Sequence, residues 1–279
     1  MNTLISPHAL AGLLEADDLL VVDCRFDLAD TVRGAREYAL AHVPRAIHAD
    51  LNRDLCDLRK KGLGRHPLPD AADFSRVLSN WGWTPGTRTV VYDDAGGALA
   101  AARLWWMLRL AGGLQVAVLD GGYKAWREAE LPSTDAVAPR APKTVAVAFD
   151  AKQIVYTDEL MKTRERILLL DARAAPRFRG ENETIDPVAG HIPGARNRPF
   201  ADNLRADGRF KPAEELRAEF LDIIGDTKPE NVVHSCGSGV TACHNLLAME
   251  HAGLHGSRVY APSWSGWISD RANPVELGA

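Results

Sequence analysis

The chain is poor in cysteine and has no long apolar run. These two shortages argue against a disulfide-rich protein and against a membrane-spanning one. Four cysteines in 279 residues are too few for a disulfide framework. None of them has CxxC spacing, so a structural metal site is not expected. No apolar run reaches the roughly 18–20 residues that span a bilayer. The first residues, MNTLISPHALAGLLEADD, lack the basic start of a signal peptide. We therefore expect a reduced, cytoplasmic protein that does not cross a membrane.

The charge balance excludes another class of partner. The formal net charge is −4, and Lys and Arg form no long run. Binding to nucleic acid is therefore not expected. The hydrophobic content of 46% is ample for sizeable cores, and the length favours two domains.

Four segments of the first half recur in the second half in the same order. The pairs are Leu19–Leu28 with Ile167–Phe178, Ala41–Leu55 with Gly190–Leu204, Arg88–Gly112 with Glu230–Gly253, and Val116–Trp126 with Ser257–Trp267. Such ordered recurrence indicates a duplicated unit. The stretch 131–151 between the halves is rich in Pro, Ala and Thr and has no helical period, which predicts a linker across the surface. The expected domains are therefore residues 1–130 and 152–279.

Within each half, short β-branched runs alternate with amphipathic patterns. The predicted strands are 19–23, 89–93, 167–171 and 231–235, and the predicted helices are 72–82, 100–112, 213–225 and 239–253. This alternation predicts an α/β fold in which each domain is a mostly parallel sheet flanked by helices. Ligands of such sheets bind outside the carboxyl ends of the strands, where the loops after Asp93 and Ser235 are expected.

The loop CGSGVTA, Cys236–Ala242, has the composition of an anion cradle. Gly237 and Gly239 let the backbone bend toward a ligand, so that successive N–H groups point inward. A helix expected to start near Val240–Thr241 adds its positive end. A thiol at that focus is expected to have a lowered pKa. The alternative is a cysteine that serves as a small buried hydrophobe in a tight turn. When the halves are aligned, Asp94 stands opposite Cys236, so only the second half has the thiol.

In these and other segments the chain resembles the two-domain rhodanese-type sulfurtransferases. The resemblance is carried by CGSGVTAC after a strand, by DARAAPRF, and by GHIPGA with its degenerate partner AHVPRA. The loop CGSGVTA is similar to that of the 3-mercaptopyruvate sulfurtransferases. The thiosulfate-preferring rhodaneses carry basic residues at the two positions after the cysteine, which are Gly237 and Ser238 here. The resemblance implies two tandem rhodanese-like domains, the first a non-catalytic copy with Asp94 at the cysteine position.

The resemblance also implies a reaction. Cys236 takes sulfane sulfur from 3-mercaptopyruvate, becomes a persulfide, and passes the sulfur to a thiol, cyanide or a thioredoxin-like acceptor, without a metal or cofactor. Ser238 and Thr241 are expected to hydrogen-bond the substrate, although either side chain can instead cap the helix that follows. Gly237, Gly239 and Val240 complete the substrate-binding loop.

Residues outside the loop receive roles from the same resemblance. Arg177 matches the arginine that pairs with the substrate carboxylate, although its alternative is a solvated surface charge. The mercaptopyruvate enzymes often carry another arginine near Thr184, which Arg179 is a candidate to replace. His66 matches a catalytic histidine supplied by the first domain, although a simple loop histidine is the alternative. Asn52 stands where its acidic partner is expected, so a complete Cys–His–Asp relay is not supported.

Two other histidines and three other functions complete the expectations. His42 and His191 stand at corresponding positions of the two copies and are expected to be scaffold residues. A thiosulfate sulfurtransferase is the nearest alternative function, and a non-catalytic sulfur carrier or binding module is a remote one. A dual-specificity phosphatase would need an arginine to close the loop, where Ala242 and Cys243 stand instead.

Overall fold

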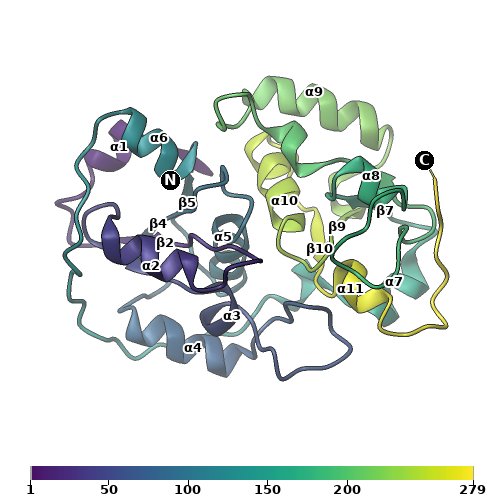
Figure 1. Ribbon diagram of the computed structural model, residues 1–279, viewed down its shortest axis with the longest axis horizontal. Coiled ribbons are helices and arrows are strands. Elements are labelled where there is room, and N and C mark those ends of the chain that lie inside the picture. Colours follow the sequence, from purple (N-terminus) through teal and green to yellow (C-terminus); the bar gives the residue numbers. More distant parts are fainter. Residues whose placement is uncertain (1, 279) are drawn as a thin grey trace. The chain divides into compact units, whose positions relative to one another are not determined.

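The computed structural model describes residues 2–278, which divide into two compact units (Figure 1). The first unit holds the chain up to Asp57, together with Pro69–Asp150 and Arg205–Phe210. The second unit holds Leu58–Leu68, Ala151–Leu204 and the chain from Lys211 onward. Each unit has a five-stranded parallel sheet flanked by helices, so the predicted α/β fold is confirmed.

The first unit orders its strands β1-β5-β4-β2-β3. Its strands are β1 (Leu4–Ile5), β2 (Leu19–Asp23), β3 (Ala46–His48), β4 (Arg88–Tyr92) and β5 (Val116–Leu119). Its helices are α1 (Pro7–Ala11), α2 (Arg33–Leu40), α3 (Leu51–Asp54), α4 (Ala71–Asn80), α5 (Ala101–Leu110) and α6 (Gly122–Glu128). The strands β2, β4 and β5 are almost wholly buried, as their continuous apolar runs require in a sheet covered on both faces.

The second unit repeats this order as β6-β10-β9-β7-β8. Its strands are β6 (Ile154–Val155), β7 (Leu168–Asp171), β8 (Arg196–Asn197), β9 (Val232–Ser235) and β10 (Arg258–Tyr260). Its α-helices are α7 (Thr157–Thr163), α8 (Ala175–Phe178), α9 (Ala213–Ile224), α10 (Ala242–His251) and α11 (Ser263–Trp267). Short 3₁₀ helices cover Ala151–Gln153, Phe200–Asn203 and Pro229–Asn231. The predicted strands and helices are therefore present, with ends that differ by a few residues.

The ladders correct one alignment between the halves. Asp23 pairs with Tyr92 in the first sheet, and Asp171 pairs with Ser235 in the second. Tyr92 therefore corresponds to Ser235, and the next residue, Asp93, corresponds to Cys236. The sequence alignment that placed Asp94 opposite Cys236 was wrong by one residue. Two uniformly apolar strands match equally well in neighbouring registers, and only their hydrogen bonds distinguish the registers.

Residues 131–150, which follow α6, form an extended strap that lies along the first unit. Backbone N–H groups of Lys143, Val145 and Val147 donate to the Ser79 carbonyl, the Ser79 hydroxyl and the Ser75 hydroxyl. Ser75 and Ser79 lie on α4, so the strap follows this helix. None of the helices in residues 2–278 is long and apolar enough to cross a bilayer.

Candidate active site

The loop after β9 surrounds the thiol of Cys236. Cys236 is only 1% exposed, at the carboxyl end of β9, the central strand of its sheet. Gly239 has a φ of 77°, a conformation that favours glycine, and its N–H donates to Cys236 Sγ at 3.1 Å. The helix α10 begins at Ala242, directly after the expected start near Val240–Thr241, and directs its positive end at this loop.

Short contacts from α11 orient the loop. The N–H groups of Trp264 and Ser265 donate to the carbonyls of Cys236 and Gly237, each at 2.9 Å. Those carbonyls are therefore turned away from the thiol. Ser263 Oγ accepts the Cys236 N–H at 3.1 Å and lies 4.0 Å from Sγ. Sequence reasoning missed Ser263, although its alignment with Gly122 in the repeat was an available signal, because a glycine often marks a position of positive φ. The structure gives both residues a positive φ, 50° for Ser263 and 59° for Gly122.

His66 and Ser238 form a buried pair beside the thiol. His66 Nδ1 lies 2.8 Å from Ser238 Oγ, and both residues are less than a tenth exposed. Because Leu58–Leu68 belongs to the second unit, the structure brings the predicted histidine into the same body as the loop. Asn52 belongs to the first unit, where its backbone N–H donates to the Asp50 carboxylate that caps α3.

The segment 58–68 is held on α11 by close backbone packing. Gly64 has a φ of 89°, and a Cβ there would lie 2.4 Å from the Pro262 carbonyl oxygen. The Arg65 N–H donates to Ser265 Oγ at 2.9 Å, and the Ser269 hydroxyl donates to the Gly62 carbonyl at 3.3 Å. These contacts require glycine at position 64 and fix the two residues that follow it.

Arg177 lies beside the loop but is already ion-paired. Its Nε and Nη2 donate to the Glu183 carboxylate, and Nη2 also reaches Asp186 Oδ2 at 3.0 Å. Burial opposes ionisation of Glu183, but hydrogen bonds from Arg177 and from the N–H groups of Asp186 and Ile185 outweigh it and lower the pKa of Glu183. The remaining nitrogen, Nη1, lies 3.8 Å from where a Cβ of Gly237 would stand.

Arg65 is a second arginine at the loop, and sequence reasoning missed it. Its Nη1 donates to Asp186 Oδ1 at 2.5 Å, and its Nη2 lies 3.1 Å from the Cβ position of Gly237. The available signal was its place directly before His66. Arg179, the candidate substitute for a second arginine, instead pairs with Glu181 on the surface, and Thr184 is exposed.

The remaining predicted loop residues line the turn into α10. Val240 is buried, and its carbonyl accepts the Cys243 N–H at 3.1 Å. Thr241 is the N-cap residue of α10, but its hydroxyl makes no capping hydrogen bond. The alternative capping role predicted for Thr241 is therefore not used, and its partly exposed hydroxyl keeps its hydrogen-bonding capacity.

The first unit shows what the same loop does without a cysteine. The buried Asp93 carboxylate accepts five backbone N–H groups at 2.8–3.2 Å, from Ala95, Gly97, Leu99, Ala100 and Ala101. The loop that follows this strand is therefore built to surround an anion. In the first unit that anion is the Asp93 side chain itself, so the loop there holds no thiol that could carry sulfur.

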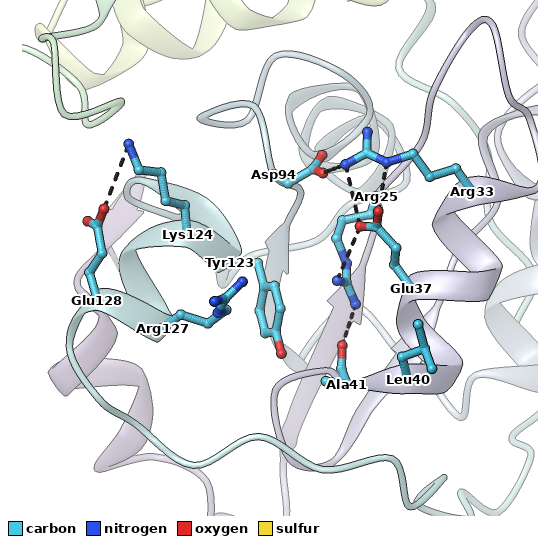
Figure 2. A pocket seen from close by; sticks show the side chains of 10 residues that line it. All are labelled: Arg25, Arg33, Glu37, Leu40, Ala41, Asp94, Tyr123, Lys124, Arg127 and Glu128. Carbon is cyan, nitrogen blue, oxygen red and sulfur yellow. Dashed lines mark hydrogen bonds and ion pairs between the residues drawn. The ribbon is translucent and has the colours of Figure 1, made fainter.

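A pocket of about 630 Å³ lies over that first-unit loop (Figure 2). Figure 2 shows Asp94 facing Arg33 across one side of the pocket, with Tyr123 between Arg25 and Arg127. The Asp94–Arg33 ion pair is 2.5 Å long. Burial raises the pKa of Asp94, although Arg33 opposes the shift. Two carboxylates thus occupy the region that corresponds to Cys236 and Gly237 in the second unit.

His42 and His191, which stand at corresponding positions of the two halves, have matching structural roles. His42 Nδ1 lies 2.6 Å from the Tyr38 carbonyl and its ring stacks on Tyr38. His191 Nδ1 lies 2.9 Å from the Phe178 carbonyl and its ring stacks on Phe178. The predicted scaffold role of both residues is confirmed.

Comparisons with known proteins agree with this duplicated architecture. The Rhodanese-like domain family matches residues 6–129 and 156–270. The chain is 47% identical to a probable 3-mercaptopyruvate sulfurtransferase of Pseudomonas aeruginosa, with 99% of this chain and 98% of that protein covered. It is 37% identical to a putative thiosulfate sulfurtransferase of Mycobacterium tuberculosis, with 99% and 98% covered. The solved 3-mercaptopyruvate sulfurtransferase from Leishmania major is 33% identical with a TM-score of 0.83, covering 95% of this chain and 73% of that one. The chain therefore belongs to the rhodanese family and carries one rhodanese-like domain in each half.

Proposed function

We propose that the protein is a 3-mercaptopyruvate sulfurtransferase in which Cys236 carries the transferred sulfur as a persulfide. The proposal is carried by the environment of the Cys236 sulfur. Cys236 Sγ accepts the Gly239 N–H at 3.1 Å and lies in the loop before α10. Backbone donors and a helix N-terminus directed at a sulfur atom stabilise the negative charge of a persulfide carried there.

The first half-reaction transfers sulfur to the enzyme. The Cys236 thiolate attacks the thiol sulfur of 3-mercaptopyruvate, and the carbon–sulfur bond breaks. The electron pair of that bond passes into the neighbouring carbonyl and gives the enolate of pyruvate, which then takes a proton. Cys236 is left as a persulfide, and no metal or organic cofactor enters the step.

The second half-reaction restores the thiolate. A thiol acceptor in its thiolate form, or cyanide, attacks the outer sulfur of the persulfide. The sulfur–sulfur bond breaks, its electrons return to Cys236 Sγ, and the acceptor leaves as a persulfide or as thiocyanate. A thioredoxin-like dithiol fits the same role, because its second thiol releases the transferred sulfur as hydrogen sulfide while the dithiol becomes a disulfide.

Ser238 and His66 supply a hydrogen-bonding pair for the enolate. Ser238 lies two residues after Cys236 in the same loop, so its hydroxyl is placed to reach the enolate oxygen of a donor whose sulfur is attacked by Cys236. Ser238 Oγ is held at 2.8 Å from His66 Nδ1, which orients its hydroxyl and provides a route for the proton that pyruvate needs. A preorganised hydrogen-bond donor at a developing oxyanion raises the rate of the step more than it tightens the binding of 3-mercaptopyruvate.

The charges around the loop favour a monoanionic donor. Three arginines, Arg65, Arg173 and Arg177, lie among three carboxylates, Asp171, Glu183 and Asp186, and are ion-paired with them. This set is neutral overall, and no lysine or arginine follows Cys236 in the loop. A dianion such as thiosulfate gains most where fixed positive charge is in excess. The carboxylate of 3-mercaptopyruvate needs only hydrogen-bond donors from an arginine.

The test is a comparison of donors. Steady-state kcat/KM is measured with 3-mercaptopyruvate and with thiosulfate, using cyanide as the acceptor. Cys236→Ser should abolish turnover, and mass spectrometry should find one added sulfur atom on Cys236 of the wild type after donor alone. Cys56→Ser is the matched control, because burial raises the pKa of Cys56 to about 12 and keeps that thiol inert.

Each outcome separates the alternatives. A higher kcat/KM with 3-mercaptopyruvate supports the proposal. A higher value with thiosulfate makes the protein a thiosulfate sulfurtransferase. A folded wild type that transfers sulfur from neither donor and gains no sulfur on Cys236 would be a binding module.

A further inference from the structure

We propose that the pocket over the first-unit loop is a second ligand site, which binds a free amino acid in its zwitterionic form. The pocket lies where β2 and β4 end, because Arg25 and Asp94 line it and each stands two residues after the last residue of its strand. The chain leaves these neighbouring strands toward opposite edges of the sheet, to β3 and to β5, and ligands bind at such a point. The inference does not rest on the proposed function, since every lining residue belongs to the first unit.

One side of the pocket repeats an arrangement of charged groups from the second unit. Arg33 Nε donates to Glu37 Oε1 at 2.8 Å, and Arg25 Nη1 lies 3.7 Å from Glu37 Oε2. The second unit joins the same atoms at 3.1 and 3.6 Å in the set Arg177, Glu183 and Arg173. The first unit therefore keeps an ordered set of charges beside its loop, although that loop holds no thiol.

Asp94 makes this side of the pocket negative. By strand register Asp94 corresponds to Gly237, so a carboxylate stands where the second unit has no side chain. Arg33 faces two carboxylates of the pocket, those of Glu37 and Asp94, which leaves one negative charge in excess. Asp94 Oδ1 is buried and accepts no hydrogen bond from residues 2–278. An ammonium group of a ligand on this side would supply the missing charge and the missing hydrogen-bond donor.

The facing side of the pocket, formed by α6, is positive. Lys124 Nζ lies 3.7 Å from Glu128 Oε1, so these two charges balance. Arg127 is exposed, and its guanidinium forms no ion pair or hydrogen bond with residues 2–278. Figure 2 shows this guanidinium beside the ring of Tyr123, on the opposite side of the pocket from Glu37. The α6 side thus offers an unpaired cation to a ligand carboxylate.

Arg25 adds a fixed donor between the two sides. Its side chain is only 4% exposed, and the Asp23 carboxylate balances its charge by accepting Nε and Nη2 at 2.9 and 2.6 Å. The Ala41 carbonyl also accepts Nη2, at 2.7 Å, and the Tyr123 ring centroid lies 4.3 Å from Cζ. Nη1 has only the 3.7 Å contact with Glu37, which is longer than a hydrogen bond. A buried guanidinium with an unused nitrogen beside a pocket is a ready contact for an oxyanion.

Charges of opposite sign on opposite sides select a ligand that carries both. A simple anion would satisfy only Arg25 and Arg127, and a simple cation would satisfy only Glu37 and Asp94. A free amino acid brings an ammonium group for the acidic side and a carboxylate for the basic side. The volume of about 630 Å³ leaves room for its own side chain.

Calorimetry with full-length Cys236→Ser tests the inference, because this variant can bind small molecules without transferring sulfur. The probes are the twenty common amino acids, each titrated alone, and then the N-acetyl and amide derivatives of the tightest binder. Each derivative lacks one of the two charges and should bind at least roughly tenfold more weakly than the parent amino acid. Arg127→Gln should weaken binding of the parent by a similar factor but should hardly change binding of the amide, which has no carboxylate to lose.

Two further variants serve as controls. Arg36→Gln removes an exposed arginine of α2 that pairs with Asp30 and does not line the pocket, so affinity should not change. Arg177→Gln alters the second unit and should also leave the affinity unchanged, which separates this pocket from the cysteine loop. A merely structural Arg127 would weaken binding of the parent and the amide alike, so the split between them is the decisive readout.

Several results would overturn the inference. If the N-acetyl derivative binds as tightly as the amino acid, the pocket recognises only an anion. If the amide binds as tightly, or if no amino acid loses affinity in Arg127→Gln, the pocket does not bind the zwitterion. Lost affinity in Arg177→Gln but not in Arg127→Gln would place the amino acid at the cysteine loop instead. None of these measurements uses sulfur transfer, so a failure of the proposed function would leave this inference standing.

Discussion

The stability of the protein should fall in mild acid because of one buried histidine, His234. This residue lies within β9, is 0% exposed, and its Nε2 is 3.1 Å from Ser257 Oγ. Its Nδ1 has no hydrogen-bond partner in the described part of the chain. Burial lowers the pKa of His234 from 6.5 to about 3. The corresponding residue of the first unit, by strand register, is Val91.

The direction and size of the effect follow from that pKa. Well above pH 6.5 the ring is neutral in both the folded and the unfolded chain, so its full contribution to stability is present. Below that value the unfolded chain binds a proton that the folded chain refuses, and stability is lost progressively until the pH nears 3. At about pH 5 the loss is about 2 kcal/mol, and the slope approaches about 1.4 kcal/mol per pH unit.

The assay is urea unfolding of wild type and His234→Val at about pH 7.5 and about pH 5. Valine is the natural occupant of this position in the first unit, so the variant should keep the strand. The free energy of unfolding of the wild type should drop by about 2 kcal/mol more than that of the variant over this range. His255→Ala, which removes a histidine that is 69% exposed, should behave like the wild type.

Parallel losses would refute the reasoning. If wild type and His234→Val lose the same free energy between the two pH values, His234 accepts a proton in the folded state. The neutral buried ring described above would then be incorrect. A constant offset between the two proteins does not bear on the question, because it cancels in the comparison.

Two further predictions concern the loop geometry. Asp93→Asn replaces a carboxylate that accepts five N–H groups and should lower the free energy of unfolding by about 2–3 kcal/mol. Asp94→Asn should lower it by less than about 1 kcal/mol, because that side chain loses only a partly exposed ion pair. Equal melting temperatures for the two variants would contradict the role given to Asp93. Gly64→Ala places a Cβ 2.4 Å from the Pro262 carbonyl and should displace Arg65 and His66, so kcat/KM should fall at least roughly tenfold. Gly62→Ala, at a φ of 73° with only Ser269 Oγ at 4.0 Å, carries the same backbone strain without the clash and should retain most activity.

Much of the protein was determined by the local pattern of its sequence. Apolar strand runs, amphipathic helices and their ordered recurrence predicted two α/β domains, because periodicity and repetition are visible without knowledge of any contact. The cysteine loop was also predictable, since two glycines, a thiol and a following helix are adjacent in the chain. The scaffold role of His42 and His191 followed from their presence in both copies.

Tertiary structure alone decided the features that depend on register or on distant contacts. A ladder of hydrogen bonds, and not the apolar pattern, assigns Asp93 to the cysteine position, because neighbouring registers of a buried strand have the same composition. The hydrogen bond from the Cys236 N–H to Ser263 Oγ depends on the turn after β10, whereas Cys236 itself follows β9. The convergence of Arg65 and Arg177 on Gly237 depends on a buried carboxylate, Asp186, that joins segments more than a hundred residues apart. Such contacts form only when the chain has folded, and no local pattern encodes them.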